Sequence, residues 1–112
     1  MNMYIFANSD ADMCPGRLAA QVGHVVQVII EELLRDEYET TPTPVHCIDY
    51  LKWKTSPTKI ILAATESQLL ELMKQHGARA FYDTVSDQRQ LTAVGFLPGS
   101  INKSDVRNYR LI

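Results

Sequence analysis

Apolar and polar positions follow one another in blocks along this 112-residue chain, and the blocks predict strands and helices in turn. Four short apolar runs, at residues 3–7, 59–63, 79–83 and 91–96, have the length and composition of β-strands. The first two are almost entirely apolar, which is typical of a sheet that is covered on both faces. We therefore expect a small mixed four-stranded β-sheet.

In the segments between these strands, apolar residues recur at helical spacing and predict helices. Residues 16 to 35 carry apolar side chains over close to half of a helix circumference, with Arg17, Gln21 and His24 on the opposite side. A shorter helix is expected from Pro44, with Thr43 as its N-cap. Further helices are expected at 66–76 and between 102 and 108. The order β-α-α-β-α-β-β-α predicts an α/β domain with helices on both faces, a three-layer α/β/α arrangement.

Polar segments separate these elements. Residues 36–43 are expected to form a loop after the long helix, and residues 84–90 a loop between the third and fourth strands. Thr65 and Gln68 make a capping-box pattern, and Gly77 is placed to end the helix that follows them. Residues 109–112 are expected to be an apolar tail.

Length and composition indicate a single domain over residues 1–112. Hydrophobic residues at 46% and charged residues at 21% are ordinary globular values. No apolar run reaches the roughly 20 residues that span a bilayer, and the first residues lack a secretion signal. Cys14 and Cys47 are too few for a disulfide framework, so we expect free thiols in a reducing, cytoplasmic compartment.

The formal net charge of −2 and the pI near 5.8 argue against a broad nucleic-acid surface, so any such contact must be local. One basic cluster contains an aromatic residue: Lys52, Trp53, Lys54 and Lys59. It could touch a nucleic acid. The favoured interpretation is a solvated loop with Trp53 in the core.

Candidate chemistry gathers where the first strand meets the long helix. Arg17, Gln21 and His24 are four and three residues apart, so they form one stripe from the helix N-terminus. Asp10 follows the first strand and Asp83 closes the third, and ligands of open α/β sheets bind outside the carboxyl ends of strands. These five residues predict a polar site. The alternative is a solvent-facing stripe with two turn-forming aspartates.

His24 is a candidate general base because imidazole titrates near neutral pH. A Cys14–His24 nucleophile pair is a weaker hypothesis, since nothing in the sequence marks the thiol as activated. The three histidines fall in three separate predicted helices without paired ligand spacing, so no metal site is expected. No phosphate-loop or dinucleotide glycine pattern occurs.

The stretch Asp10-x-x-Met13-x-x-Gly16-Arg17-x-Ala-Ala-Gln21-x-x-His24 resembles the signature of the type-2 peptidyl-tRNA hydrolases. Later landmarks match in order: Trp53 with Lys59-Ile-Ile, Thr92-Ala-Val-Gly95-x-x-Pro98, and Asp105-Val106 with Arg110-Leu111. The resemblance therefore covers nearly the whole chain.

Two departures from that pattern fall in the expected site. Arg17 replaces the usual lysine. Asp83 matches the aspartate of the family's Asp-Ala-Gly-x-Thr-Gln loop, but Val85 stands for the glycine and Asp87 for the threonine, and the segment after them is shorter. If Asp87 lies close to Asp83, each carboxylate should disfavour the ionised form of the other.

The resemblance implies an esterase without metal or cofactor that cleaves peptidyl-tRNA at the 3′ acceptor end, and that works as a homodimer in the cytoplasm. Carried over by position, the catalytic candidates are Arg17, His24, Asp83, Asp10 and Asp87, and the substrate-binding candidates are Gln21, Gln88, Gly16 and Asn8. A wide apolar arc on the long helix, with Val28 among its polar positions, also favours a homodimer. The alternative function is a non-catalytic tRNA- or protein-binding module whose altered loop has lost the chemistry.

Overall fold

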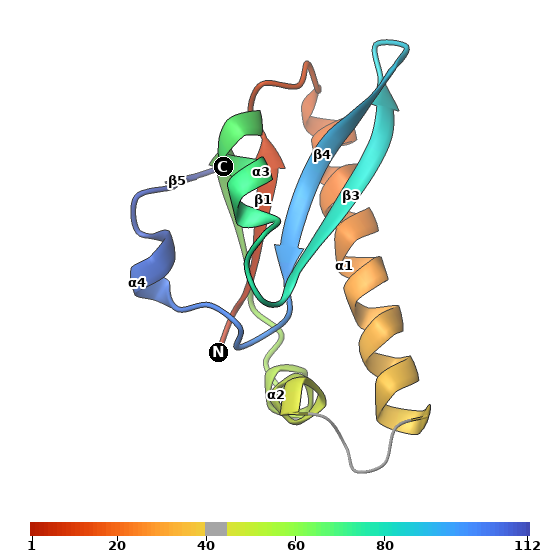
Figure 1. Cartoon of the computed structure of the whole chain (residues 1–112), viewed down its shortest axis with the longest axis vertical. Helices are drawn as coiled ribbons and strands as arrows, with labels where there is room; N and C mark the ends of the chain where they lie inside the picture. The colour runs from red at the N-terminus through yellow and green to blue at the C-terminus, as the bar shows by residue number, and fades with distance from the viewer. Residues whose placement is uncertain (40–44) are drawn as a thin grey trace.

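The computed structural model describes residues 1–39 and 45–112, and the side chains of residues 1–36 and 47–112. These residues form a mixed α/β fold of five strands and four helices (Figure 1). The elements are, in chain order, β1 (Met3–Asn8), α1 (Pro15–Glu39), α2 (Val45–Trp53), β2 (Lys59–Ala64), α3 (Glu66–Leu72), β3 (Ala78–Val85), β4 (Gln88–Phe96), α4 (Lys103–Val106) and β5 (Arg110–Leu111). The predicted class and order of elements are confirmed. The predicted number of four strands is wrong.

The sheet has the strand order β3-β4-β1-β2-β5. β1 and β2 run parallel, whereas the other neighbouring pairs are antiparallel. Because β4 runs against β1, the turn between β3 and β4 lies at the same edge of the sheet as the carboxyl ends of β1 and β2. We call this the carboxyl edge. Figure 1 shows the start of α1 and the β3–β4 turn there, at the top of the view.

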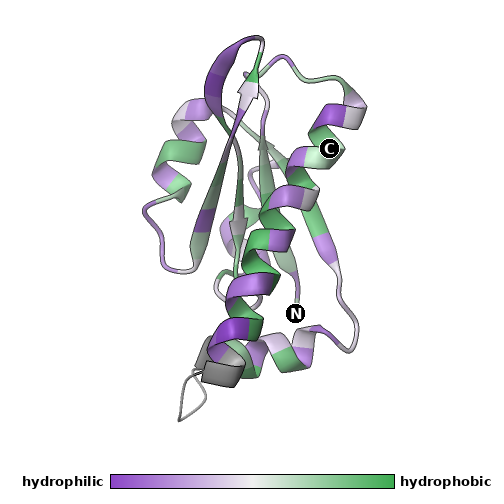
Figure 2. Cartoon of the chain, turned by 90° about the vertical axis from the view of Figure 1, so that its right-hand side faces the viewer, coloured by the Kyte–Doolittle hydropathy of each residue, from purple (hydrophilic) through white to green (hydrophobic). Residues whose placement is uncertain are grey.

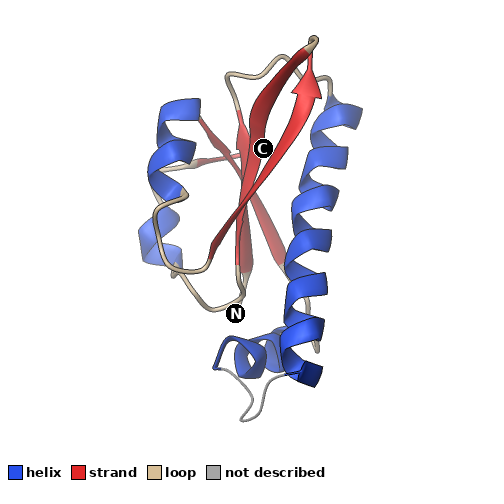
Figure 3. Ribbon diagram, turned by 45° about the vertical axis from the view of Figure 1, so that its right-hand side comes forward, coloured by secondary structure: helices blue, strands red, loops and turns tan. Residues whose placement is uncertain are grey.

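Two hydrophobic clusters lie on opposite faces of the sheet. Alternate residues of β1 enter them: Met3 and Ile5 pack with α1 and α2, whereas Tyr4 and Phe6 pack with the cluster that contains residues of α3 and α4. Figure 3 shows α1 on one side of the sheet and α3 on the other. This double coverage explains why β1 is buried along its whole length.

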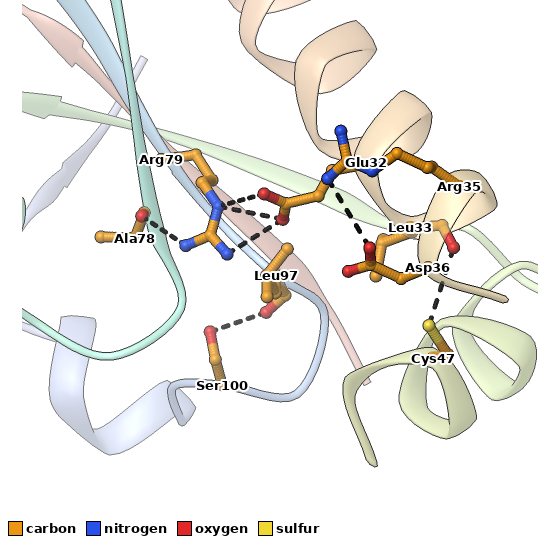
Figure 4. Close-up of polar contacts among 9 residues, drawn as sticks. All are labelled: Glu32, Leu33, Arg35, Asp36, Cys47, Ala78, Arg79, Leu97 and Ser100. Atoms are coloured by element: carbon orange, nitrogen blue, oxygen red, sulfur yellow. Dashed lines mark hydrogen bonds and ion pairs between the residues drawn. The ribbon is translucent and has the colours of Figure 1, made fainter. Parts of the chain in front are cut away.

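Helix α1 is held close to the sheet at two places. A Cβ at Gly95 of β4 would lie 2.8 Å from Ile29 Cδ1, so the missing side chain lets the helix approach the strand. Further along, Arg79 of β3 pairs with Glu32, with its Nε 3.0 Å from both carboxylate oxygens and its Nη2 2.9 Å from one of them (Figure 4). Figure 2 shows hydrophobic and hydrophilic residues interspersed along α1. These contacts fix the helix over β4 and β3.

The predicted loop at residues 84–90 is wrong. β3 continues to Val85 and β4 begins at Gln88, so Ser86 and Asp87 alone form the turn, with φ of 52° and 64°. Two-residue turns with positive φ at both positions are the ones that suit the twist of a β-hairpin. This part of the hairpin carries mostly polar side chains, such as Thr84 opposite Arg89, and so lacks the apolar signal from which strands are predicted.

Other boundaries also move. α1 extends to Glu39, into the predicted loop at 36–43, and the rest of that loop with the Thr43–Pro44 helix start lies outside the described residues. The Thr65–Gln68 capping box is confirmed. α3 ends at Leu72 rather than at residue 76, before Gly77 reverses the chain with φ of 83°.

Residues 109–112 are more than a tail. Arg110 and Leu111 pair antiparallel with β2 and form the fifth strand, which is too short to show a period in the sequence. Tyr109 packs edge-on against Phe6, with the ring centroids 4.9 Å apart.

The favoured interpretation of the basic cluster is confirmed for the burial of Trp53 but wrong for the loop, because Lys52 and Trp53 end α2 and Lys59 begins β2. The Trp53 side chain is 4% exposed, and its Nε1 donates to the Thr58 carbonyl at 2.9 Å. Neither cysteine forms a disulfide within the described part of the chain: Cys14 is exposed, and the buried Cys47 thiol donates to the Leu33 carbonyl (Figure 4).

Candidate active site

Gln21 joins α1 to β3 and β4 at the carboxyl edge. Its Nε2 donates to Asp83 Oδ2 at 2.9 Å, and its Oε1 accepts from the Thr92 hydroxyl at 2.9 Å. The side chain is only 2% exposed, and it stands four residues before the buried Val25 on the row that packs on the sheet. The expectation that Gln21 lies opposite the apolar face is therefore wrong. Gln21 extends the buried row of α1 with a polar group.

Thr92 determines which end of the Gln21 amide meets Asp83. Its hydroxyl is fully buried and lies within hydrogen-bond distance of Gln21 Oε1 and, at 3.2 Å, of the Phe81 carbonyl. An amide carbonyl facing a hydroxyl donor turns the NH₂ group toward the carboxylate. From the sequence, Thr92 was only part of the family pattern. The feature that could have indicated its role is a single hydroxyl within the otherwise apolar run at 91–96.

Asp83 is held in its ionised form. The hydrogen bond from Gln21 is the main cause that lowers the pKa of the Asp83 carboxyl below its ordinary value. The Thr84 backbone N–H, which donates to Oδ1 at 2.8 Å, and the nearby His24 and Arg17 add to this, against an opposing effect of burial. Asp87 lies in the turn beyond the end of β3 and is not among the groups that shift this pKa.

Arg17 reaches from the first turn of α1 to the hairpin. Its Nη1 donates to the Thr84 carbonyl at 3.0 Å, which leaves other N–H groups of the guanidinium available. The backbone N–H groups of Gly16 and Arg17 precede the first N–H of α1 that is hydrogen-bonded along the chain, which Leu18 donates to Cys14. The Arg17 cation and unpaired backbone N–H groups therefore lie together at the N-terminal end of α1.

A polar cavity of about 590 Å³ opens between this helix end and the hairpin. Asp12, Cys14 and Arg17 line one side, and residues 84–87 line the other. Of the predicted residues, Arg17 and Asp87 thus face one space. Gln88 is exposed beside it at the start of β4, and Gly16 is exposed in the first turn, where a Cβ would meet nothing within 4 Å.

His24 stacks on Phe81 of β3, with the ring centroids 4.9 Å apart and an angle of 24° between the planes. The imidazole is exposed, one turn further along α1 than Gln21. Phe81 thus orients the candidate base His24. This role was not predicted, because the sequence around Phe81 indicates only a strand. Cys14 lines the cavity, whereas His24 is not among its lining residues.

Asp10 and Asn8 brace the loop between β1 and α1. Asp10 Oδ2 accepts from the Glu66 N–H at 2.9 Å and so caps α3, while its own N–H donates to Asn8 Oδ1 at 2.8 Å. Asn8 is buried, and its Nδ2 donates to the Leu91 carbonyl at 2.7 Å. The contacts of Asp10 therefore go to α3 rather than to Asp83.

Across the described side chains, no group of three or more histidine, cysteine, aspartate or glutamate residues is placed to hold a metal ion. Within the same part of the chain, no helix combines the length and apolar character that crossing a membrane requires.

The carboxyl edge of the sheet brings together an ionised carboxylate, a stacked imidazole and a guanidinium at a helix end. Groups of these kinds are suited to acid–base chemistry on an anionic substrate. Residues 1–106 match the model of the family Peptidyl-tRNA hydrolase PTH2, and the chain belongs to this family. Its activity is the hydrolysis of peptidyl-tRNA, as the resemblance predicted. No curated protein matches the chain closely enough to be named beside it.

Proposed function

We propose that the ester of peptidyl-tRNA is hydrolysed at the cavity between the first turn of α1 and the β3–β4 hairpin. The observation that carries this proposal is the Asp83 carboxylate, which Gln21 keeps ionised beside Arg17 and His24. Catalysis of ester hydrolysis needs a group that accepts or orients the proton of water and donors that stabilise the oxyanion. Arg17 lines the cavity, and Asp83 and His24 lie close to Arg17 without lining it.

Asp83, with His24 beside it, positions or deprotonates the attacking water. The lowered pKa keeps Asp83 negative at neutral pH, and the stack on Phe81 limits the orientation of the imidazole. Asp10 is less suited to this role because its carboxylate caps α3. It instead holds the β1–α1 loop in place together with Asn8.

Arg17 and the free backbone N–H groups of the first helical turn stabilise the oxyanion or bind the terminal phosphate. Gln21 acts through Asp83 as a positioning residue, because both ends of its amide are engaged inside the protein. Asp87 lines the cavity, and the exposed Gln88 and Gly16 are next in the chain to lining residues, so all three are placed to contact the substrate.

Turnover of N-blocked aminoacyl-tRNA, measured beside the unblocked form, tests this assignment. We expect release of tRNA from the blocked substrate by the unmodified protein, and strongly reduced release by Asp83→Asn and His24→Ala. Binding of tRNA without turnover by the unmodified protein would instead favour the non-catalytic module. Full activity after alkylation of Cys14 would rule out a cysteine nucleophile.

We also infer a three-layer α/β/α arrangement, a cytoplasmic location and a homodimer. Helices on both faces support the first, and a substrate formed during translation supports the second. Val28 and Leu34 of α1 remain 37% and 38% exposed, which supports association through α1. Light scattering at micromolar concentration should give a dimer mass that Val28→Lys reduces; a monomeric mass of the unmodified protein would contradict the homodimer.

A further inference from the structure

A second cationic region lies outside the catalytic cavity, in α4 and β5. Between residues 103 and 112 the chain carries Lys103, Arg107 and Arg110 against one carboxylate, Asp105. That carboxylate accepts from the Asn102 N–H and caps α4. The segment is therefore locally basic in a protein whose formal net charge is −2.

Arg110 borders a cleft of about 230 Å³ whose walls are mostly polar. Ser9, Thr65, Gln68 and Asn108 also line it. Among residues 1–36 and 47–112, the Arg110 guanidinium has no hydrogen-bond or ion-pair partner, whereas Arg79 is held by Glu32 and Lys74 by Glu71. An unpaired guanidinium is the side chain best suited to bind a phosphate with two parallel hydrogen bonds.

The capping box of α3 leaves donors directed to this cleft. Thr65 Oγ1 and Gln68 Oε1 both act as acceptors within the box. The hydroxyl proton of Thr65 and the NH₂ group of Gln68 therefore remain available. Together with Arg110, they offer one positive charge and several donors, which matches a phosphate diester rather than a cation.

The cleft and the catalytic cavity share the carboxyl edge. Arg110 pairs with Ala63 near the end of β2, and the cavity lies by the β3–β4 turn. Figure 1 shows β5 and this turn on opposite sides of the upper part of the molecule. Since β5 is separated from β4 by β1 and β2, the spacing of ~4.8 Å between strands gives roughly 14 Å along the edge. Stacked nucleotides rise by about 3.4 Å each, so this span corresponds to roughly four nucleotides.

We propose that the Arg110 cleft binds a backbone phosphate of the tRNA a few nucleotides away from the ester. The proposal rests on catalysis at the cavity between α1 and the hairpin. It supplies the local contact that a weakly acidic protein needs to hold a polyanion. It also separates recognition of the tRNA chain, at β5, from chemistry on the ester, at β3.

Two variants test the cleft. Arg110→Gln removes the cation from an exposed strand, and Gln68→Glu places a carboxylate in the cleft while keeping an acceptor for the capping box. Lys52→Gln is the matched control because it makes the same change of charge on an exposed residue of α2, near the opposite end of the sheet (Figure 1).

We expect Arg110→Gln and Gln68→Glu to raise KM for N-acetylaminoacyl-tRNA with little change of kcat. The slope of log binding constant against log salt should fall by about 1 for Arg110→Gln and stay unchanged for Lys52→Gln. Neither cleft variant should alter hydrolysis of an N-acetylaminoacyl ester of adenosine, which is too short to reach the cleft.

An Arg110→Gln protein with the same salt slope and KM as the Lys52→Gln protein would overturn the cleft while leaving catalysis at the cavity in place. An Asp83→Asn protein that hydrolyses the adenosine ester at the normal rate would overturn the proposed catalytic site, whatever the cleft variants do to binding.

Discussion

The two sides of the active site differ in how closely they follow their family. The α1 side keeps Gly16, Gln21 and His24 of the family signature, whereas the hairpin side departs from it at Val85 and Asp87. The contacts that join the two sides use Asp83, the Thr84 carbonyl and Thr92, which belong to the paired strands. The hairpin departures lie at the end of β3 and in the turn, beyond those contacts, whereas the α1 departure, Arg17, makes one of them.

The comparison shows that Asp83 is held mainly by contacts outside the turn that departs from the family pattern. The place of Asp83 is fixed by its pairing with Gln90, by the bond from Gln21 and by the Thr84 N–H, and not by Ser86 or Asp87 in the turn. The strands on either side of the turn therefore hold Asp83 in place, whereas the turn residues line the cavity.

Asp83→Asn should have the largest effect, because it removes the negative charge on which both sides converge. We expect kcat/KM for N-blocked aminoacyl-tRNA to fall by about 10²- to 10⁴-fold. Circular dichroism should show an unchanged fold, since asparagine keeps the acceptor for Gln21. A loss of less than tenfold in kcat/KM would contradict a catalytic role for Asp83 in the hairpin.

Arg17→Ala tests the α1 side with the next largest effect. Loss of one donor to a developing oxyanion costs about 10²- to 10³-fold in kcat. Arg17→Lys should retain much more activity, because it restores the family's usual residue. If Arg17 binds a phosphate instead, the salt slope of tRNA binding falls by about 1 in Arg17→Ala. Normal kcat, KM and salt slope together would exclude both roles.

Gln21→Leu breaks the bond between the two sides while leaving the charge in place. We expect kcat/KM to fall by up to about 10²-fold through misplacement of Asp83. The pKa of Asp83 should rise toward its ordinary value, so the acid limb of the pH–rate profile should move to higher pH. Thr92→Val should shift the limb in the same direction by less.

The same bond gives the pH dependence of stability a definite sign. The folded pKa of Asp83 is lowered, so its ionised form stabilises the fold above the pKa of the unfolded state. This contribution is lost as the pH falls through the lowered pKa. Denaturant titrations at several acidic pH values should show a weaker dependence in Gln21→Leu, and an identical dependence would contradict the assigned cause.

Asp87→Asn should have the smallest effect, because Asp87 lies in the turn, beyond the contacts that hold Asp83. We expect less than a tenfold change in kcat/KM, far below the roughly 10²- to 10⁴-fold loss of Asp83→Asn. Asparagine tolerates the φ of 64° at this position, so the turn should keep its shape. A loss as large as that of Asp83→Asn would give the turn a direct part in the chemistry.

The sequence predicted those parts of the molecule whose signal is local. The strand–helix junction at residues 10–24 and the capping box at Thr65 follow from spacing and residue type alone. The hairpin did not, since its pairing at 84–90 depends on backbone hydrogen bonds between polar residues. β5 was missed for the same reason: it exists only because β2 offers an open edge.

The candidate site residues were correctly placed on one helix, but the burial of Gln21 was misjudged. Spacing placed Arg17, Gln21 and His24 on one stripe, yet Gln21 is buried on the row that faces the sheet. A single polar residue at the end of an apolar row has two possible partners, water or a buried carboxylate. Only the register of β3 and β4, which brings Asp83 and Thr92 under α1, decides between them.

Gln21 stands in line with Val25 and Ile29, at the close approach of α1 to Gly95. The same row of α1 residues packs on the sheet and holds Asp83, so folding and catalysis depend on one contact. We expect heat to abolish activity at the same temperature at which α1 separates from the sheet, and not before. A substitution that loosens the packing of α1 on the sheet should therefore lower activity as well as stability.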